Sequence, residues 1–161
     1  MSAEETDEGL RRLFERIRVI AVVGASPSWD RPSCAIMQYL KSASFRIVPV
    51  NPNIAGQTIL DEPVHGRLSD IPVHVDLVDI FRKPEAVGAV VEEAIAIGAG
   101  AVWMQKGVRD AATAMRARKA GLTVVIDRCI KTEHARLFGR ASGESANRRA
   151  ADQADALFEV D

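Results

Sequence analysis

The chain has 161 residues, of which 47% are hydrophobic and 27% charged, and its formal net charge at pH 7 is −1. These values fit one globular domain with a real apolar core, and the small net charge gives no sign of a nucleic-acid or anionic-membrane partner. The start of the chain is acidic and polar rather than signal-like, no apolar run approaches the roughly 20 residues of a membrane span, and the two cysteines imply no disulfide framework. We therefore expect a soluble, cytoplasmic protein.

The first half of the chain alternates between helical and strand patterns. Residues 1–17 are expected to hold a short amphipathic helix, Asp7–Arg16, with acidic residues at its start. An unbroken apolar run, Val19–Val23, predicts a strand buried on both faces. A helix over 32–41 and a second strand over 45–50 follow.

The second half repeats the alternation after an irregular stretch. Glycines and prolines punctuate residues 54–72, which we expect to contain short strand pieces and one helical turn. Later elements are strands over 75–81, 101–104 and 122–126, helices over 84–97 and 110–119, and one or two helical turns over 131–138. Residues 139–161 form a tail that is predicted to be helical or partly disordered.

Strands that alternate with helices of about a dozen residues indicate an α/β fold. We predict a single Rossmann-like domain over residues 18–138, with an open, mostly parallel sheet of about five strands and helices on both faces. Ligands in such sheets bind at the carboxyl ends of the strands. The loops after the five strands therefore share one edge, where the sequence places the following cations: Arg31, Arg82, Lys83, Lys106 and Arg128.

The turn after the first strand is the main candidate for a phosphate site. It reads Gly24-Ala25-Ser26, with Arg31 and Ser33 at the start of the next helix. Free backbone N–H groups at such a turn, a guanidinium and a hydroxyl all suit phosphate oxygens. The single glycine departs from the G-x-G-x-x-G fingerprint of dinucleotide-binding proteins. The second strand also ends in Val50-Asn51-Pro52 rather than in the acid that binds ribose hydroxyls, so both features weigh against NAD.

Five segments together resemble a known family. They are IAVVGASPSWDRPS, RIVPVNPN, VDLVDIFRKPE, AIAIGAGAVWMQKGV and AGLTVVIDRCIKTEH, in this order. They resemble the small stand-alone CoA-binding proteins of the YccU-like family, which is similar in fold to the N-terminal domain of the succinyl-CoA synthetase alpha subunit. The resemblance implies a Rossmann-like domain whose cofactor is coenzyme A or an acyl-CoA.

The resemblance also implies which residues bind the cofactor. The phosphates would lie on Gly24, Ala25 and Ser26, with Arg31 and Ser33 nearby, and Val50, Asn51 and Pro52 would lie by the nucleotide. The strand end at Phe81 and Arg82 would cover the adenine side, and Gln105, Lys106 and Gly107 would line the path of the pantetheine arm. Cys129 follows the last strand, between Arg128 and Lys131. These cations could lower its thiol pKa, which would allow a mixed disulfide with CoA, although an inert buried cysteine is the favoured interpretation.

The sequence contains no evident catalytic machinery. The histidines and cysteines lack metal-ligand spacing, no nucleophile motif is present, and His134 is interpreted as a structural residue near the last strand. The leading hypothesis is therefore a CoA- or acyl-CoA-binding protein without evident catalytic machinery. The alternatives are an NAD(P)-dependent oxidoreductase, an acyl-CoA-processing enzyme, or an interaction module that has lost its ligand.

Overall fold

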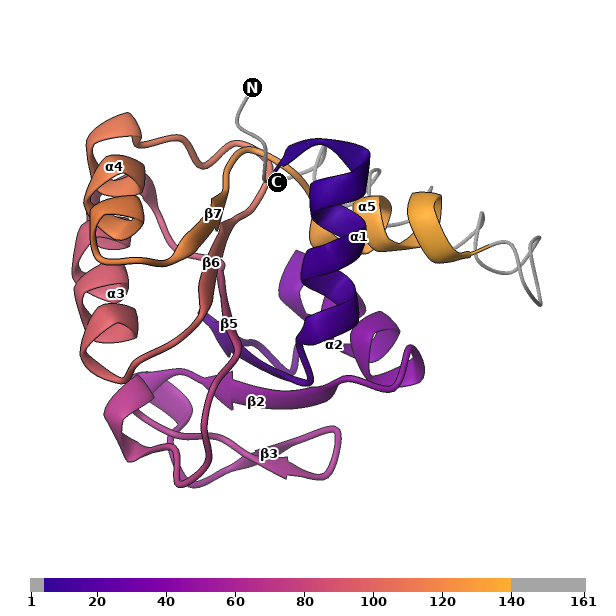
Figure 1. Ribbon diagram of the computed structural model, residues 1–161. Helices are drawn as coiled ribbons and strands as arrows, with labels where there is room; N and C mark the ends of the chain where they lie inside the picture. Colours follow the sequence, from indigo (N-terminus) through magenta and orange to yellow (C-terminus); the bar gives the residue numbers. More distant parts are fainter. Residues whose placement is uncertain (1–4, 140–161) are drawn as a thin grey trace.

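The computed structural model describes residues 5–139, in which helices cover both faces of a parallel sheet (Figure 1). Its five strands lie in the spatial order β2-β1-β5-β6-β7. They are β1 (Val19–Val23), β2 (Arg46–Val50), β5 (Leu77–Ile80), β6 (Ala101–Met104) and β7 (Thr123–Val125). The predicted fold class is thus confirmed.

Two groups of helices bury the two faces of the sheet (Figure 1). One face packs against α1 (Asp7–Arg16), α2 (Pro32–Ser42) and α5 (Ile130–Phe138), in a cluster that contains Leu13, Met37 and the fully buried Trp103. The other face packs against α3 (Pro84–Ala96) and α4 (Ala111–Lys119), in a cluster that contains Val78 and Val91. Because both faces are covered, the strands are almost uniformly apolar.

The order in which strands are added to the sheet changes sides at β1. Helix α2 leads from β1 to β2 on one side, and the chain then returns to β5 on the other side of β1. In the register of the sheet, Val23 at the end of β1 pairs with Val50 of β2 and Ile80 of β5. The loops that follow these three strand ends therefore leave the same edge at the switch point, where α/β sheets commonly bind ligands.

The irregular segment forms a small unit beside β2. Its elements are η2 (Pro52–Ile54), β3 (Thr58–Ile59), β4 (Glu62–Pro63) and η3 (Leu68–Asp70), and β3 pairs with β4 in an antiparallel hairpin. His65 also forms an isolated parallel bridge with Val50. The predicted short strand pieces and helical turn are confirmed.

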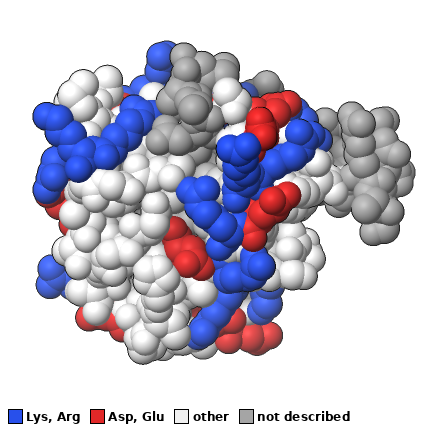
Figure 2. All heavy atoms as spheres, viewed as in Figure 1, with Lys and Arg blue, Asp and Glu red and all other residues white. Residues whose placement is uncertain are grey.

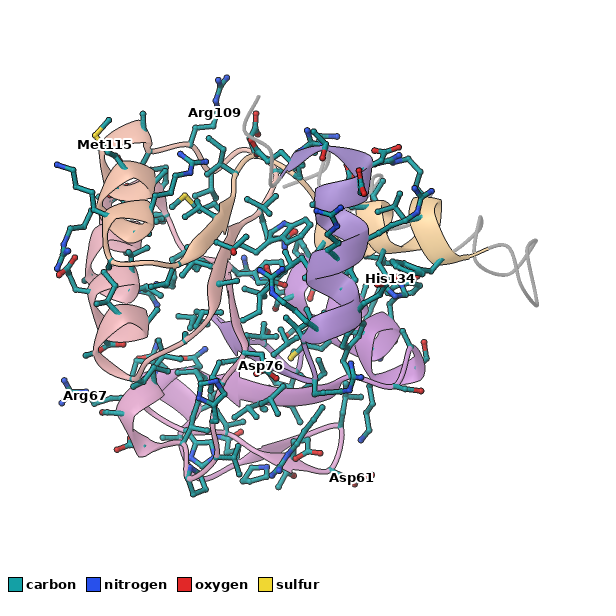
Figure 3. All side chains as sticks on the ribbon, viewed as in Figure 1. Asp61, Arg67, Asp76, Arg109, Met115 and His134 are labelled. Carbon is teal, nitrogen blue, oxygen red and sulfur yellow. The ribbon has the colours of Figure 1, made fainter. Side chains whose placement is uncertain are left out.

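The predicted boundaries of the helices and strands lie within two residues of the observed ones. Asp76, predicted to lie in a strand, precedes β5, and its Oδ2 accepts the backbone N–H groups of Arg18 and Val19 at 2.9 Å each. Figure 3 labels this residue at the amino edge of the sheet and Arg109 in the loop after β6, at the carboxyl edge. Helix α5 has nine residues, more than the predicted one or two turns. The predicted tail element lies outside the described residues apart from Gly139.

Candidate functional site

The turn after β1 requires glycine at Gly24 for two reasons. Its φ angle is +88°, in the left-handed region that L side chains rarely adopt. A Cβ atom at this position would also lie 2.1 Å from the carbonyl oxygen of Phe81, which follows β5. The absence of a side chain thus lets the ends of two neighbouring strands approach each other at the switch point.

The backbone donors of this turn already have acceptors within the protein. The N–H groups of Gly24 and Ala25 both donate to the carbonyl oxygen of Val50, at 3.0 and 3.3 Å, and that of Ser26 donates to Ser33 Oγ at 3.2 Å. Asn51 Nδ2 donates to the carbonyl oxygen of Ala25 at 2.9 Å. The expectation of free N–H groups at this turn is therefore wrong, because internal hydrogen bonds occupy them. An anion bound here would need hydrogen-bond donors from other groups.

Two helices direct positive N-termini to this edge of the sheet. The N-cap residues are Arg31 for α2 and Lys83 for α3, and neither side chain makes a capping hydrogen bond. Both helices have proline at their start, and α2 has no acidic residue in its first turn. A cation at a helix N-terminus is unfavourable by about 0.3–1 kcal/mol, because the helix dipole is already positive there. An anion bound between the two helices would remove this repulsion.

A cavity of about 600 Å³ lies between these helix starts and the strand ends. Its described lining residues are Gly24, Ser26, Arg31, Pro32, Ser33, Asn51, Phe81, Arg82, Lys83, Gln105, Lys106 and Val108. They include four cations and no carboxylate, and none of these cations forms an ion pair within residues 5–139. By contrast, basic and acidic side chains alternate over α1 and α5 in Figure 2, as in the ion pairs Arg12–Glu8 and Arg136–Asp7.

A second cavity, of about 570 Å³, lies at the ends of β6 and β7 and shares Lys106 with the first. Its two arginines have carboxylate partners: Arg128 lies 3.4 Å from Glu133, and Arg109 lies 3.7 Å from Asp127. The first cavity therefore has the unneutralised positive charge that a multiply charged anion requires.

Cys129 lines this second cavity rather than the first. It is 4% exposed, and burial raises the pKa of its thiol, opposite to the lowering considered from its basic sequence neighbours. A thiol with a raised pKa is a poor nucleophile at neutral pH. The geometry thus favours the interpretation of Cys129 as a buried, inert cysteine.

A buried polar pair adjoins the first cavity: Gln105 lines it, and Asp79 lies behind Gln105 in hydrogen-bond contact. Asp79 in β5 is 0% exposed and Gln105, directly after β6, is 1% exposed. Gln105 Nε2 donates to Asp79 Oδ1, whereas Asp79 Oδ2 and Gln105 Oε1 have no hydrogen-bond partner within residues 5–139. Burial raises the pKa of Asp79 to about 8, so this carboxyl group is neutral at pH 7.

The structure brings most of the predicted site residues together. Those that line the first cavity are Gly24, Ser26, Arg31, Ser33, Asn51, Phe81, Arg82, Gln105 and Lys106. Ala25, in the turn, and Val50, at the end of β2, are buried and do not line the cavity, and Pro52 is exposed at the start of η2. The N–H group of Gly107 donates to Asp127 Oδ1 at 2.8 Å. Lys83, which the sequence placed among the cations of this edge but which was not predicted to bind the cofactor, also lines the cavity. The residues that sequence reasoning missed as cavity contacts are Pro32 and Val108.

His134 is a structural residue, as predicted. Its Nδ1 atom lies 2.8 Å from the hydroxyl oxygen of Tyr39, and the rings of Phe14, Phe45 and Phe138 surround it (Figure 3). Burial lowers the pKa of its imidazole to about 4, so the ring is neutral at pH 7. It lines neither cavity.

The fold and the site define a Rossmann-like domain with a cationic cavity at the topological switch point. Residues 18–135 match the family described as "CoA binding domain", and this chain belongs to that family. The predicted family resemblance is thereby confirmed. Among curated proteins, the chain is 32% identical over 126 residues to the uncharacterized protein YneT of Bacillus subtilis, which covers 78% of this chain and 92% of YneT.

Solved structures show the same fold. A hypothetical protein from Pyrococcus horikoshii OT3 superposes with a TM-score of 0.81 at 36% identity, over 86% of this chain and 97% of that one. A Thermus thermophilus protein gives a TM-score of 0.80 at 36% identity, over 83% and 99%. A dinucleotide-forming acetyl-coenzyme A synthetase from Ca. Korarchaeum cryptofilum gives 0.62 at 23% identity, over 73% of this chain and 28% of that larger chain, which shows a shared fold. Within residues 5–139, no helix is both long and apolar enough to span a membrane.

Proposed function

We propose that this chain binds coenzyme A or an acyl-CoA, with the CoA phosphates in the first cavity. The observation that carries the proposal is the convergence of two uncapped helix N-termini, with basic N-caps Arg31 and Lys83, on a cavity that has four cations and no carboxylate. CoA carries a diphosphate and a ribose 3′-phosphate, so it supplies the negative charge that these groups lack. Membership of the CoA binding domain family supports the same ligand.

The phosphates would be held chiefly by side chains and by the start of α2. Because Val50 and Ser33 already accept the N–H groups of the turn, the guanidinium of Arg31 is the first candidate for a direct phosphate contact. Its position as the N-cap of α2 places its charge beside the positive end of the helix dipole. Arg82, Lys83 and Lys106 would complete the positive surroundings.

We further propose that the chain holds this ligand without transforming it. Both cysteines are buried and have raised pKa values, and His134 packs among aromatic rings away from the cavity. A protein of this kind would sense the ligand, store it or deliver it to other proteins.

Calorimetric titration and thermal denaturation test the proposal. CoA should bind in the titration, and it should raise the melting temperature more than NAD, NADP or ATP does, because a ligand that binds only the folded state stabilises it by mass action. A larger shift with NADP would support an oxidoreductase instead, loss of the acyl group from a bound acyl-CoA would indicate an enzyme, and no shift with any ligand would favour an interaction module.

The substitution Arg31→Ala tests the site itself. Loss of a charge-assisted hydrogen bond to phosphate costs on the order of 1.5–3 kcal/mol, which corresponds to roughly a ten- to hundredfold weaker CoA affinity. Arg46→Ala is the matched control, since Arg46 is an exposed arginine at the amino end of β2, on the opposite edge of the sheet. Unchanged affinity in Arg31→Ala, or equal losses in the two variants, would remove Arg31 from the site.

A further inference from the structure

The pair Asp79 and Gln105 is an unusual feature of the sheet. Asp79 lies in the central strand β5, between Val22 of β1 and Trp103 of β6 in the register, where every other position of β5 is apolar. Asp79 Oδ2 and Gln105 Oε1 are buried without a hydrogen-bond partner in the described part of the chain. Each such atom costs free energy, and an apolar pair of similar size would avoid that cost. The pair therefore needs a reason beyond packing.

The position of Gln105 suggests that reason. It is the first residue after β6 and lines the first cavity, although it is only 1% exposed. Its amide nitrogen is taken by Asp79 Oδ1, so its oxygen is the end that remains for a ligand. An amide oxygen accepts hydrogen bonds and does not donate them, so it does not suit a phosphate group. It suits an N–H donor.

We propose that Asp79 is a positioning residue, which holds the NH₂ end of the Gln105 amide so that Oε1 accepts a hydrogen bond from an amide N–H of the pantetheine arm. This inference rests on the proposed function, because it assumes that CoA occupies the first cavity. Three of the four cations, Arg31, Arg82 and Lys83, lie in the segments that follow β1 and β5, which suit the phosphates, whereas the fourth, Lys106, follows Gln105 after β6. Gln105 follows β6, the next strand of the sheet, which leaves it for the part of the ligand beyond the phosphates.

The neutral state of Asp79 agrees with this role. A charged carboxylate in this fully buried position would be strongly disfavoured, and the pKa of about 8 keeps the group protonated at pH 7. Because Oδ1 accepts from Gln105, the proton lies on Oδ2. The carboxyl group can thus orient the amide without placing a negative charge beside the CoA phosphates.

The test compares CoA with its nucleotide half, adenosine 3′-phosphate 5′-diphosphate, which lacks the pantetheine arm. In calorimetric titrations, Gln105→Leu should weaken CoA binding about tenfold and change the affinity for the nucleotide half less than twofold. Asp79→Leu should have a similar selective effect, because it removes the carboxyl oxygen that accepts from Gln105 Nε2. Asp79→Asn is the matched control: it keeps that acceptor and places an NH₂ group where the protonated carboxyl group has its O–H, so it should bind CoA as the wild type does. Unchanged binding of the nucleotide half also shows that each variant is folded.

A double-mutant cycle separates positioning from general destabilisation. The variant Asp79→Leu/Gln105→Leu should bind CoA no more weakly than Gln105→Leu alone, because both substitutions remove the same hydrogen bond. If Asp79→Leu does not fold, Gln105→Asn replaces it: the shorter amide cannot reach Asp79, and the same selective loss is expected.

Three outcomes would overturn the inference. Unchanged CoA affinity in Asp79→Leu and Gln105→Asn would show that the amide needs no positioning. Equal losses for CoA and its nucleotide half would place the donor on the adenine or indicate a merely structural role. If the wild-type protein binds neither ligand, the proposed function itself is wrong, and the inference about Asp79 is overturned with it.

Discussion

Substitution of Gly24 by alanine should destabilise the protein through two separable effects. The first is backbone strain, because the φ angle of +88° is unfavourable for an L residue by about 1–2 kcal/mol. The second is steric: the new Cβ would lie 2.1 Å from the carbonyl oxygen of Phe81, and contacts below 3.0 Å essentially do not occur. The ends of β1 and β5 would have to separate by about 0.9 Å, the difference between these two distances.

Gly56→Ala isolates the first effect. Gly56 has the same φ angle of +88°, but a Cβ atom there would meet nothing within 4 Å. We expect this variant to lose about 1–2 kcal/mol of unfolding free energy. Gly24→Ala should lose about 2–5 kcal/mol, because overpacking adds about 1–3 kcal/mol and weakens the 2.8 Å bond from Phe81 N–H to the Val23 carbonyl oxygen.

Urea denaturation followed by far-ultraviolet circular dichroism measures both variants. The expected result is a lower midpoint for Gly24→Ala than for Gly56→Ala, with weaker CoA binding in the former alone. Equal unfolding free energies, within about 0.5 kcal/mol, would refute the argument that close approach of Phe81 requires glycine at this turn.

Two other predictions concern charge. The unfolding free energy should fall as pH rises from 6.5 to 8, because folded Asp79, with a pKa of about 8, keeps a proton that the unfolded chain has already lost. The contribution of Asp79 to the slope should be about 1.4 kcal/mol per pH unit near pH 6.5 and about half of that at pH 8, where the folded group is half deprotonated. Between about pH 4.5 and 6.5 the slope should nearly vanish, since His134, with a pKa lowered to about 4, contributes the opposite sign. Asp79→Asn should abolish the decline above pH 6.5, and a decline that persists in this variant would contradict the assignment. Lys83→Asp should raise the melting temperature, because aspartate caps a helix N-terminus and stabilises the folded protein by about 0.5–2 kcal/mol. The same substitution should weaken CoA binding, because it replaces a cation of the cavity by an anion. A gain in both melting temperature and CoA affinity would argue against an anion at this helix start.

The local elements of the fold could be read from the sequence because each has a strong local signal. The run Val19–Val23 before a single glycine, and the alternation of strands with helices, predict a parallel sheet with its ligand site at one edge. Parallel strands share that edge, so loops far apart in sequence could be assigned to one site before any contact was known.

The state of the donors at the turn could not be predicted in this way. The carbonyl oxygen of Val50 belongs to another strand, and only the register of β1 and β2 brings it within 3.0 Å of Gly24 N–H. Likewise, the basic neighbours of Cys129 in sequence suggested a lowered thiol pKa, whereas burial dominates and raises it.

The sequence by itself determined the family, the parallel α/β fold and most of the cavity residues, because these depend on local patterns and on the order of the elements. Only the tertiary structure decided that Arg31 and Lys83 face one cavity from two helices, and that Asp79 lies fully buried against Gln105. These features depend on packing between β1, β5 and β6, which sets burial and therefore charge state. Glycine at position 24 allows the ends of β1 and β5 to lie close together, and the surrounding helices and strands place the cations around the cavity.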